Sequence, residues 1–180
     1  MNVIEENGAE TDYTYDPANP YNRLTEKSPL GYTTAYAYDA NGNVVSVTTP
    51  RGATATSSDF TAFNQPQKVK DTRGNFTVLK YDARGNLVES MKLKSGVTPA
   101  IPYTPVAAQM LAWAVNGYDT YGNLTSAKRV RDFAAQIAAP SATSPTGPLI
   151  VTTFDANALY PTAIARQGDK TGDGLFDRCK

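Results

Sequence analysis

One seven-residue pattern recurs along the chain: Tyr, Asp, two variable residues, Gly, Asn and an apolar residue. The three full copies are 38–44, 81–87 and 118–124. Asp favours the first position of a type I turn because its carboxylate accepts hydrogen bonds from the next backbone N–H groups. Gly favours the left-handed position that follows. The pattern therefore predicts a three-residue hairpin loop with a bulge, joining two antiparallel strands.

The pattern is periodic. The steps from Asp16 to Asp39, to a degenerate copy at Thr61 and to Asp82 are about 23, 22 and 21 positions, within the range of about 20 to 50 that is typical of repeat proteins. A second turn lies half a period after each copy. Turn signals about every 10 or 11 residues predict short strands in an all-β array. The second turns contain Gly31, Gly52 and Gly74.

Two inserts, at about 97–115 and 128–148, lengthen the later repeats. In the first, Thr104 as N-cap, Pro105 and an Ala/Leu/Met run predict a short helix, and a buried strand is the alternative. In the second, residues 132–140 predict one or two helical turns. We expect an all-β fold of tandem antiparallel β-hairpin repeats forming a curved sheet or partial β-shell, with one short helical insert. The array covers 1–165, and 166–180 form a separate tail.

Composition narrows the function. The chain has no His, which removes His-dependent triads and His-ligated metal sites. Seventeen basic residues balance seventeen acidic ones, so we expect no nucleic-acid partner. The first ten residues have no apolar core, and we expect neither a signal peptide nor a membrane span in this chain. Asp39, Asp82 and Asp119 are explained by their turns rather than by catalysis, and we expect no enzyme activity.

For several aromatic and basic side chains, a structural role is the expected one. Alternation places Tyr32, Tyr36 and Tyr38 on one face of a strand, with small residues on the other. A core position is expected for Trp113, together with Met110 and Leu111. A small basic cluster is expected to lie on a solvated strand face. It consists of Lys128, Arg129 and Arg131.

The repeated pattern resembles the YD-repeat, or Rhs-repeat, family, named for the Tyr-Asp pair. Three copies match throughout if Val44 is accepted for Leu, and degenerate copies lie at Tyr15, Phe60 and Phe154. The resemblance covers roughly residues 11–165 and implies a strip of β-hairpins that spirals into a hollow shell. In that family, such shells enclose toxin segments or form extracellular adhesion barrels. The core segment with self-cleavage machinery that family members carry near the end of the shell is not seen here, nor is a toxin domain.

The last residues resemble an aspartate-rich calcium loop of a thrombospondin type 3 repeat. Hard cations need converging oxygen ligands around a sharp Gly turn, which Gly174 supplies. Lys180 stands where an EF-hand-like loop needs an acidic residue, and an acidic Gly turn without metal is the alternative. Cys179, two residues after the last Asp as in those repeats, is the single cysteine and has no internal disulfide partner. The expected Ca²⁺ ligands are Asp169, Thr171, Asp173, the Leu175 carbonyl and Asp177.

These observations predict a structural repeat module: a wall segment of an Rhs/YD-repeat shell or of an extended extracellular assembly, secreted or at the cell surface. The alternative is a surface adhesin that binds glycans through a Tyr-rich sheet face. Open sheet edges predict pairing with the rest of a longer polypeptide or with copies of this chain. An enclosed toxin or a glycan is a further expected partner.

Overall fold

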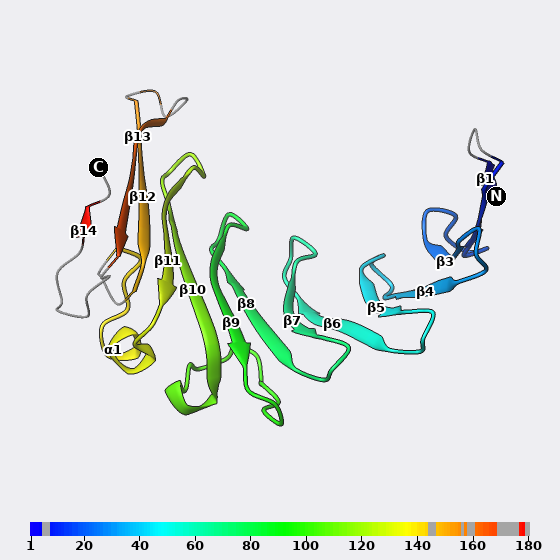
Figure 1. Cartoon of the computed structure of the whole chain (residues 1–180), viewed down its shortest axis with the longest axis horizontal. Helices are drawn as coiled ribbons and strands as arrows, with labels where there is room; N and C mark the ends of the chain where they lie inside the picture. Colours follow the sequence, from blue (N-terminus) through cyan, green and yellow to red (C-terminus); the bar gives the residue numbers. More distant parts are fainter. Residues whose placement is uncertain (5–7, 144–146, 156, 158–160, 169–176, 179–180) are drawn as a thin grey trace. The chain divides into compact units, whose positions relative to one another are not determined.

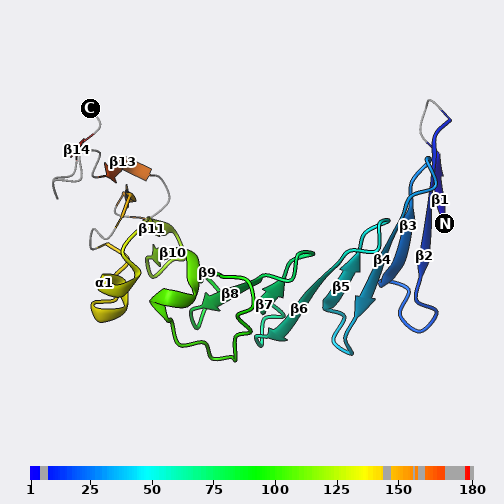
Figure 2. The same ribbon diagram turned by 60° about the horizontal axis from the view of Figure 1, so that its bottom comes forward.

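The computed structural model describes residues 1–4, 8–143, 147–155, 157, 161–168 and 177–178. The chain divides into two compact units, Met1–Asn75 and Phe76–Lys180. Both are built from antiparallel strands that follow one another in chain order, each hydrogen-bonded to the next (Figures 1 and 2). The expected all-β fold of tandem antiparallel hairpins with a short helical insert is confirmed.

The first unit is a meander of seven short strands. Consecutive strands pair through registers such as Glu26↔Thr34 and Tyr36↔Val47. A register shift just before Tyr38 marks the bulge expected at the hairpin. The strands are β1 (Asn2–Ile4), β2 (Glu10–Tyr15), β3 (Arg23–Lys27), β4 (Thr33–Tyr38), β5 (Val44–Thr48), β6 (Thr54–Phe60) and β7 (Pro66–Lys70).

The second unit continues the same topology with longer strands and carries both inserts. It begins with β8 (Phe76–Tyr81) and β9 (Leu87–Leu93), followed by a 3₁₀ turn, η1 (Ala107–Gln109), and β10 (Met110–Tyr118). It continues with β11 (Leu124–Val130), helix α1 (Phe133–Ala138), β12 (Leu149–Phe154), β13 (Pro161–Gly168) and β14 (Asp177–Arg178).

The first insert resolves in favour of the strand alternative. Only Ala107–Gln109 is helical, and Met110–Tyr118 form β10 between β9 and β11. The β10 backbone donors and acceptors are satisfied by two neighbouring strands, which outweighs the local helix propensity of Ala and Leu. The expected Thr104 cap does not form, since Val106 is the N-cap residue of η1. The second insert is helical over Phe133–Ala138, as predicted, and its N-cap Asp132 accepts from the Ala135 N–H.

A hydrophobic core lies on one face of the second unit. Val78, Met91, Trp113 and Val130 are mutual partners across β8, β9, β10 and β11, so alternation puts their side chains in one row. The first insert adds Tyr103 to the cluster, and partly buried Phe133 packs against it from α1. Trp113 and Met110 are buried as predicted, but Leu111, which lies at the register shift between Met110 and Ala112, is exposed.

The first unit has no comparable core. Among its described residues no hydrophobic side chain is buried, and Asn22 and Asn43 are the most enclosed polar residues. Strand pairing and turn hydrogen bonds therefore carry a larger share of the organisation there than apolar burial does.

Lys128 corrects one expectation from the sequence. Arg129 and Arg131 are exposed as predicted, but Lys128 is 2% exposed and lies on the opposite face, beside the core row. Its ammonium group donates to Gln136 Oε1 at 2.6 Å and to the Ser141 carbonyl, and burial lowers the pKa of Lys128. The second insert folds over this position, which the strand's own sequence did not indicate.

Within the described residues, no helix is long and apolar enough to cross a membrane.

Candidate functional site

The repeated Asp organises each turn through three hydrogen bonds to its own side chain. Asp39 Oδ1 accepts from the backbone N–H groups of Asn41 and Asn43, each at 2.9 Å. Asp39 Oδ2 accepts from the side-chain amide of Asn43, also at 2.9 Å. The Gly42 N–H donates to the Asp39 carbonyl, which closes the type I turn. Asp39 and Asn43 therefore fix the loop together.

The same geometry recurs in both units. In the other full copies, Asn86 and Asn123 donate through backbone and side chain to Asp82 and Asp119. Gly42, Gly85 and Gly122 have φ of 82°, 85° and 87°, as the left-handed position requires. In the degenerate copy at Thr61, Asn64 takes this position with φ 59°, which Asn tolerates better than most non-Gly residues.

The turn at Gly74 forms as the sequence predicts, but the sequence pattern did not indicate the role of Asp71 in it. Asp71 accepts from the N–H groups of Arg73 and Asn75 and from the Asn75 side chain, so the second turn of that repeat has the same geometry as the first. Lys70 rather than a Tyr precedes Asp71, so the Tyr-Asp pattern does not identify it. The Asp-x-x-Gly-Asn spacing, rather than Tyr-Asp, is the signal that finds it. In the turn that contains Gly52, Thr49 takes the place of the Asp, and its hydroxyl accepts a longer hydrogen bond from the Ala53 N–H, at 3.2 Å.

The Asp carboxyls of the three full copies have depressed pKa values. The Asn43 side-chain amide, then its backbone N–H, lowers the pKa of Asp39, and Asn86 does the same for Asp82. For Asp119, burial acts to raise the pKa, but the hydrogen bonds from Asn123 and the turn backbone outweigh it, and the pKa is lowered. These carboxylates are charged hydrogen-bond acceptors committed to the backbone.

Acid should loosen the turns. A folded-state pKa below the unfolded value of about 3.9 means that the unfolded chain binds more protons between the two values. The stabilisation is therefore complete above about pH 4 and is lost as pH falls through the folded-state pKa. We expect the urea midpoint to fall over this window. A variant combining Asp39→Asn, Asp82→Asn and Asp119→Asn should show a flatter acid profile, and an identical profile would contradict the assignment.

In two of the three full copies, the hydroxyl of the repeated Tyr bonds the preceding repeat. Tyr118 Oη donates to the carbonyl of Leu87 at 3.2 Å, and Tyr38 Oη donates to the carbonyl of Arg23 at 2.9 Å. In both cases the acceptor residue directly follows the Asn that ends the preceding turn, Asn86 or Asn22. The Tyr hydroxyl thus bonds the preceding repeat where its next strand begins.

Removing one of these hydroxyls should weaken the contact between the two repeats. We expect Tyr118→Phe to lower the free energy of unfolding by about 0.5 to 1.5 kcal/mol, the usual net value of a hydrogen bond. Urea denaturation followed by circular dichroism measures the change. Tyr121→Phe is the matched control, because Tyr121 is exposed and its hydroxyl makes no hydrogen bond within the described residues. Equal effects in the two variants would count against this contact.

Neighbouring turns also touch directly. The Arg84 guanidinium donates to the carbonyls of Thr120 and Asp119 in the following turn. A Cβ added to Gly122 would lie 3.7 Å from Asn86 Oδ1, and one added to Gly42 would lie 3.9 Å from Asn22 Oδ1. In these two repeats the turn Gly therefore packs beside the Asn of the preceding turn, which explains why Asn22 is nearly enclosed.

The tyrosine face of the first unit is organised around Arg23. Its guanidinium lies 4.7 Å from the ring centroid of Tyr36 and 5.4 Å from that of Tyr13. It also pairs with the Glu26 carboxylate at 3.0 Å. Both rings contact the cation, and the Tyr36 hydroxyl also accepts from Arg23 at 3.0 Å and donates to Glu26 at 3.4 Å, so these side chains consolidate the sheet face.

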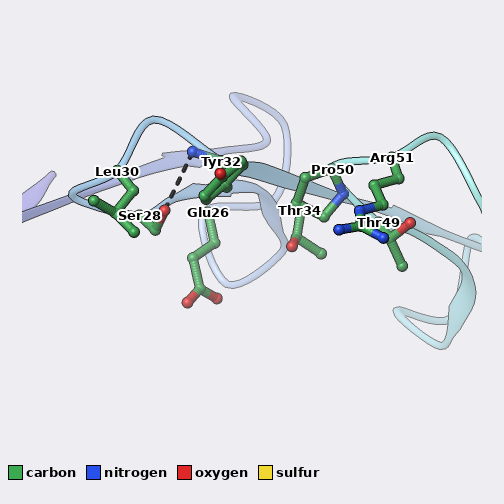
Figure 3. A pocket seen from close by; sticks show the side chains of 8 residues that line it. All are labelled: Glu26, Ser28, Leu30, Tyr32, Thr34, Thr49, Pro50 and Arg51. Atoms are coloured by element: carbon green, nitrogen blue, oxygen red, sulfur yellow. Dashed lines mark hydrogen bonds between the residues drawn. The ribbon is translucent and has the colours of Figure 1, made fainter.

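A hollow of about 840 Å³ lies beside this face, between the turn before β4 and the turn after β5. Figure 3 shows Tyr32 and Leu30 on the first side and Arg51 beside Thr49 on the other. Tyr32 is 61% exposed, unlike the packed Tyr36. Its N–H donates to Ser28 Oγ at 3.2 Å.

The expected calcium loop falls outside the described residues. Asp169, Thr171, Asp173 and Leu175 belong to the undescribed segment, and of Asp177 only the backbone is described, as the first residue of β14. Within the part of the chain that is described, no group of three or more acidic, Cys or His side chains is placed to hold a metal. The Ca²⁺ site stays a prediction.

Comparison with known proteins agrees with this geometry. Residues 19–54 match the RHS Repeat family. No curated protein matches the sequence. The crystal structure of TcdB2-TccC3 matches with a TM-score of 0.59 and 17% identity, covering 89% of this chain and 7% of that chain. The crystal structure of TcdB2-TccC3-Cdc42 matches with a TM-score of 0.60 and 17% identity, covering 89% of this chain and 7% of that chain. A structure of the Photorhabdus luminescens Tc holotoxin pore matches with a TM-score of 0.59 and 18% identity, again covering 89% of this chain and 7% of that chain.

The matched segment includes the Asp39–Asn43 turn and the hydrogen bond from the Tyr38 hydroxyl to the Arg23 carbonyl. These are the features that define the repeat in this chain. At these identities the solved structures establish a shared fold, and the chain spans about 7% of the length of the solved chains that it matches. Residues 19–54 therefore belong to the RHS, or YD, repeat family, within a chain that has the fold of part of TcdB2-TccC3.

Proposed function

We propose that this chain is a wall segment of a larger Rhs-type shell, a structural module rather than an enzyme. The observation that supports it most is the chain-order series of hairpins whose turn carboxylates are committed to the backbone and whose Tyr hydroxyls bond consecutive repeats. Such side chains hold a sheet together and leave no turn carboxylate unengaged for catalysis at these positions.

The context of such a wall is part of the proposal. The protein is secreted or displayed at the cell surface, and the assembled shell encloses a polypeptide cargo such as a toxin segment. The first unit supports a role within something larger, because no hydrophobic side chain of its described residues is buried. A single layer of strands without a core gains stability from strands added at its edge.

The outer edge of β1 is the place where further strands would add. Met1 and Tyr13 exchange backbone hydrogen bonds, and Val3 is opposite Thr11. Antiparallel alternation then directs the N–H and C=O of Asn2 and Ile4 away from β2. These groups can pair with another part of a longer polypeptide or with a second copy of the chain.

Light scattering during size-exclusion chromatography tests this edge. The purified chain should associate with increasing concentration, and Ile4→Pro should suppress association by removing the outward N–H. Ile4→Ala, which keeps the N–H, should still associate. A chain that stays monomeric at every concentration, or equal suppression by Ile4→Ala, would contradict pairing through the β1 edge.

A second candidate function is glycan binding. The hollow with the exposed Tyr32 ring favours it, because an aromatic face next to Thr34 and Thr49 hydroxyls and the Arg51 guanidinium offers stacking and hydrogen bonds to a sugar. A glycan array tests it: binding that Tyr32→Ala removes would support an adhesin, and the absence of any bound glycan would retire it.

A further inference from the structure

The second unit carries a basic groove on the face opposite its hydrophobic core. The hollow has a volume of about 560 Å³, and Arg129 and Arg131 line it together with Ala114, Ala127 and Ile150. In the sheet register, Ala114 is opposite Arg129 and Ala127 is opposite Ile150, with Asn116 opposite Ala127. These side chains therefore share one face, and the small residues form a floor beside the two arginines.

The positive charge of this groove is not neutralised within the described residues. Both arginines are exposed, and neither forms an ion pair with a described Asp or Glu. The nearest acidic residue in sequence, Asp132, caps α1 through the Ala135 N–H. Exposed Lys92 adds a third positive charge on the same face, opposite Ala112 of β10. The guanidinium groups of Arg129 and Arg131, two positions apart, repel each other. A bound anion would offset this repulsion.

We propose that this groove binds an extended polypeptide segment with alternating acidic side chains. Alternate side chains of an extended segment are about 7 Å apart, the spacing expected for Arg129 and Arg131, which are also two positions apart. Guanidinium groups bind carboxylates through paired hydrogen bonds. The Ala floor leaves room for the backbone of the segment.

The lining of the groove disfavours other anionic partners. No aromatic side chain lines it: Trp113, the single Trp, is buried on the opposite face. Sugars and single-stranded nucleic acids both rely on aromatic stacking, which the described lining does not offer. This inference is independent of the shell proposal, since it concerns one face of one unit.

The test measures binding of fluorescein-labelled peptides to the full chain by fluorescence anisotropy. An alternating Glu-Ala peptide should bind, and raised salt should weaken it. An alternating Gln-Ala peptide should not bind. The double variant Arg129→Gln/Arg131→Gln should weaken Glu-Ala binding at least about tenfold, as expected for the loss of charge-assisted hydrogen bonds.

The control variant is Lys27→Gln/Arg73→Gln, which removes the same charge from exposed positions of the first unit. It should bind the Glu-Ala peptide like the unchanged chain. Circular dichroism must show that both double variants keep their strand content. Equal loss in the control, no binding by the unchanged chain at low salt, or tighter binding of a single-stranded oligonucleotide or a sulfated oligosaccharide would each overturn the proposal.

Discussion

Trp113→Ala should remove about 3 to 5 kcal/mol from the free energy of unfolding of the second unit. Trp113 is 3% exposed and lies in the core row between Met91 and Val130. Its Nε1 donates to Glu89 Oε2 at 2.9 Å, so the variant creates a cavity and also removes a hydrogen bond from that carboxylate. A loss of this size is a large part of the typical stability of a domain, about 5 to 15 kcal/mol.

Hydrogen exchange is the suitable measurement for this variant, because Trp113 is the single Trp and fluorescence would lose its probe. Protection of the β8 to β11 amides should fall strongly. Leu111→Ala is the control on the same strand: Leu111 is exposed, and its truncation should change stability by less than about 0.5 kcal/mol. Similar, small effects of both substitutions would mean that Trp113 is not part of a packed core.

Gly147→Ala should cost about 3 kcal/mol, near the top of the range for overpacked sites. A Cβ at this position would overlap the carbonyl oxygen of Arg129 and lie 3.1 Å from the Arg131 nitrogen. The Arg129 N–H donates to the Pro148 carbonyl at 3.1 Å, so the chain here lies directly on β11. Since backbone cannot move aside as a flexible side chain can, the segment leading into β12 must shift, and Leu149, which is 2% exposed, moves with it.

Urea denaturation with circular dichroism measures the cost of Gly147→Ala. Thr143→Ala is the control in the same insert, because Thr143 is exposed and its truncation should change stability by less than about 0.5 kcal/mol. If Gly147→Ala were as mild as the control, the close approach of the backbone to β11 would be wrong.

The turns could be predicted from the sequence because their chemistry is local. The Asp39 carboxylate, the Gly42 backbone and the Asn43 amide lie within five consecutive residues, and the structure brings them together as the spacing indicates. The turn at Gly74 was also predicted, but the role of Asp71 in it was not, because the repeated pattern begins with a Tyr and Lys70 precedes Asp71.

The remaining features depend on contacts between distant segments. Residues 110–118 have helical composition but form β10, because β9 and β11 flank them. Lys128 reads as a surface residue on its strand, and only the fold of the second insert explains why it is buried against Gln136. The acceptor of the Tyr118 hydroxyl is a backbone carbonyl, which carries no sequence signal.

A cryo-electron microscopy map of the complete natural polypeptide tests the wall-segment account most directly. We predict that residues 1–180 lie within a continuous antiparallel sheet of a shell, with the outward N–H and C=O groups of Ile4 paired to a neighbouring strand. A map in which these residues form a separate domain, with the β1 edge open to solvent, would contradict it.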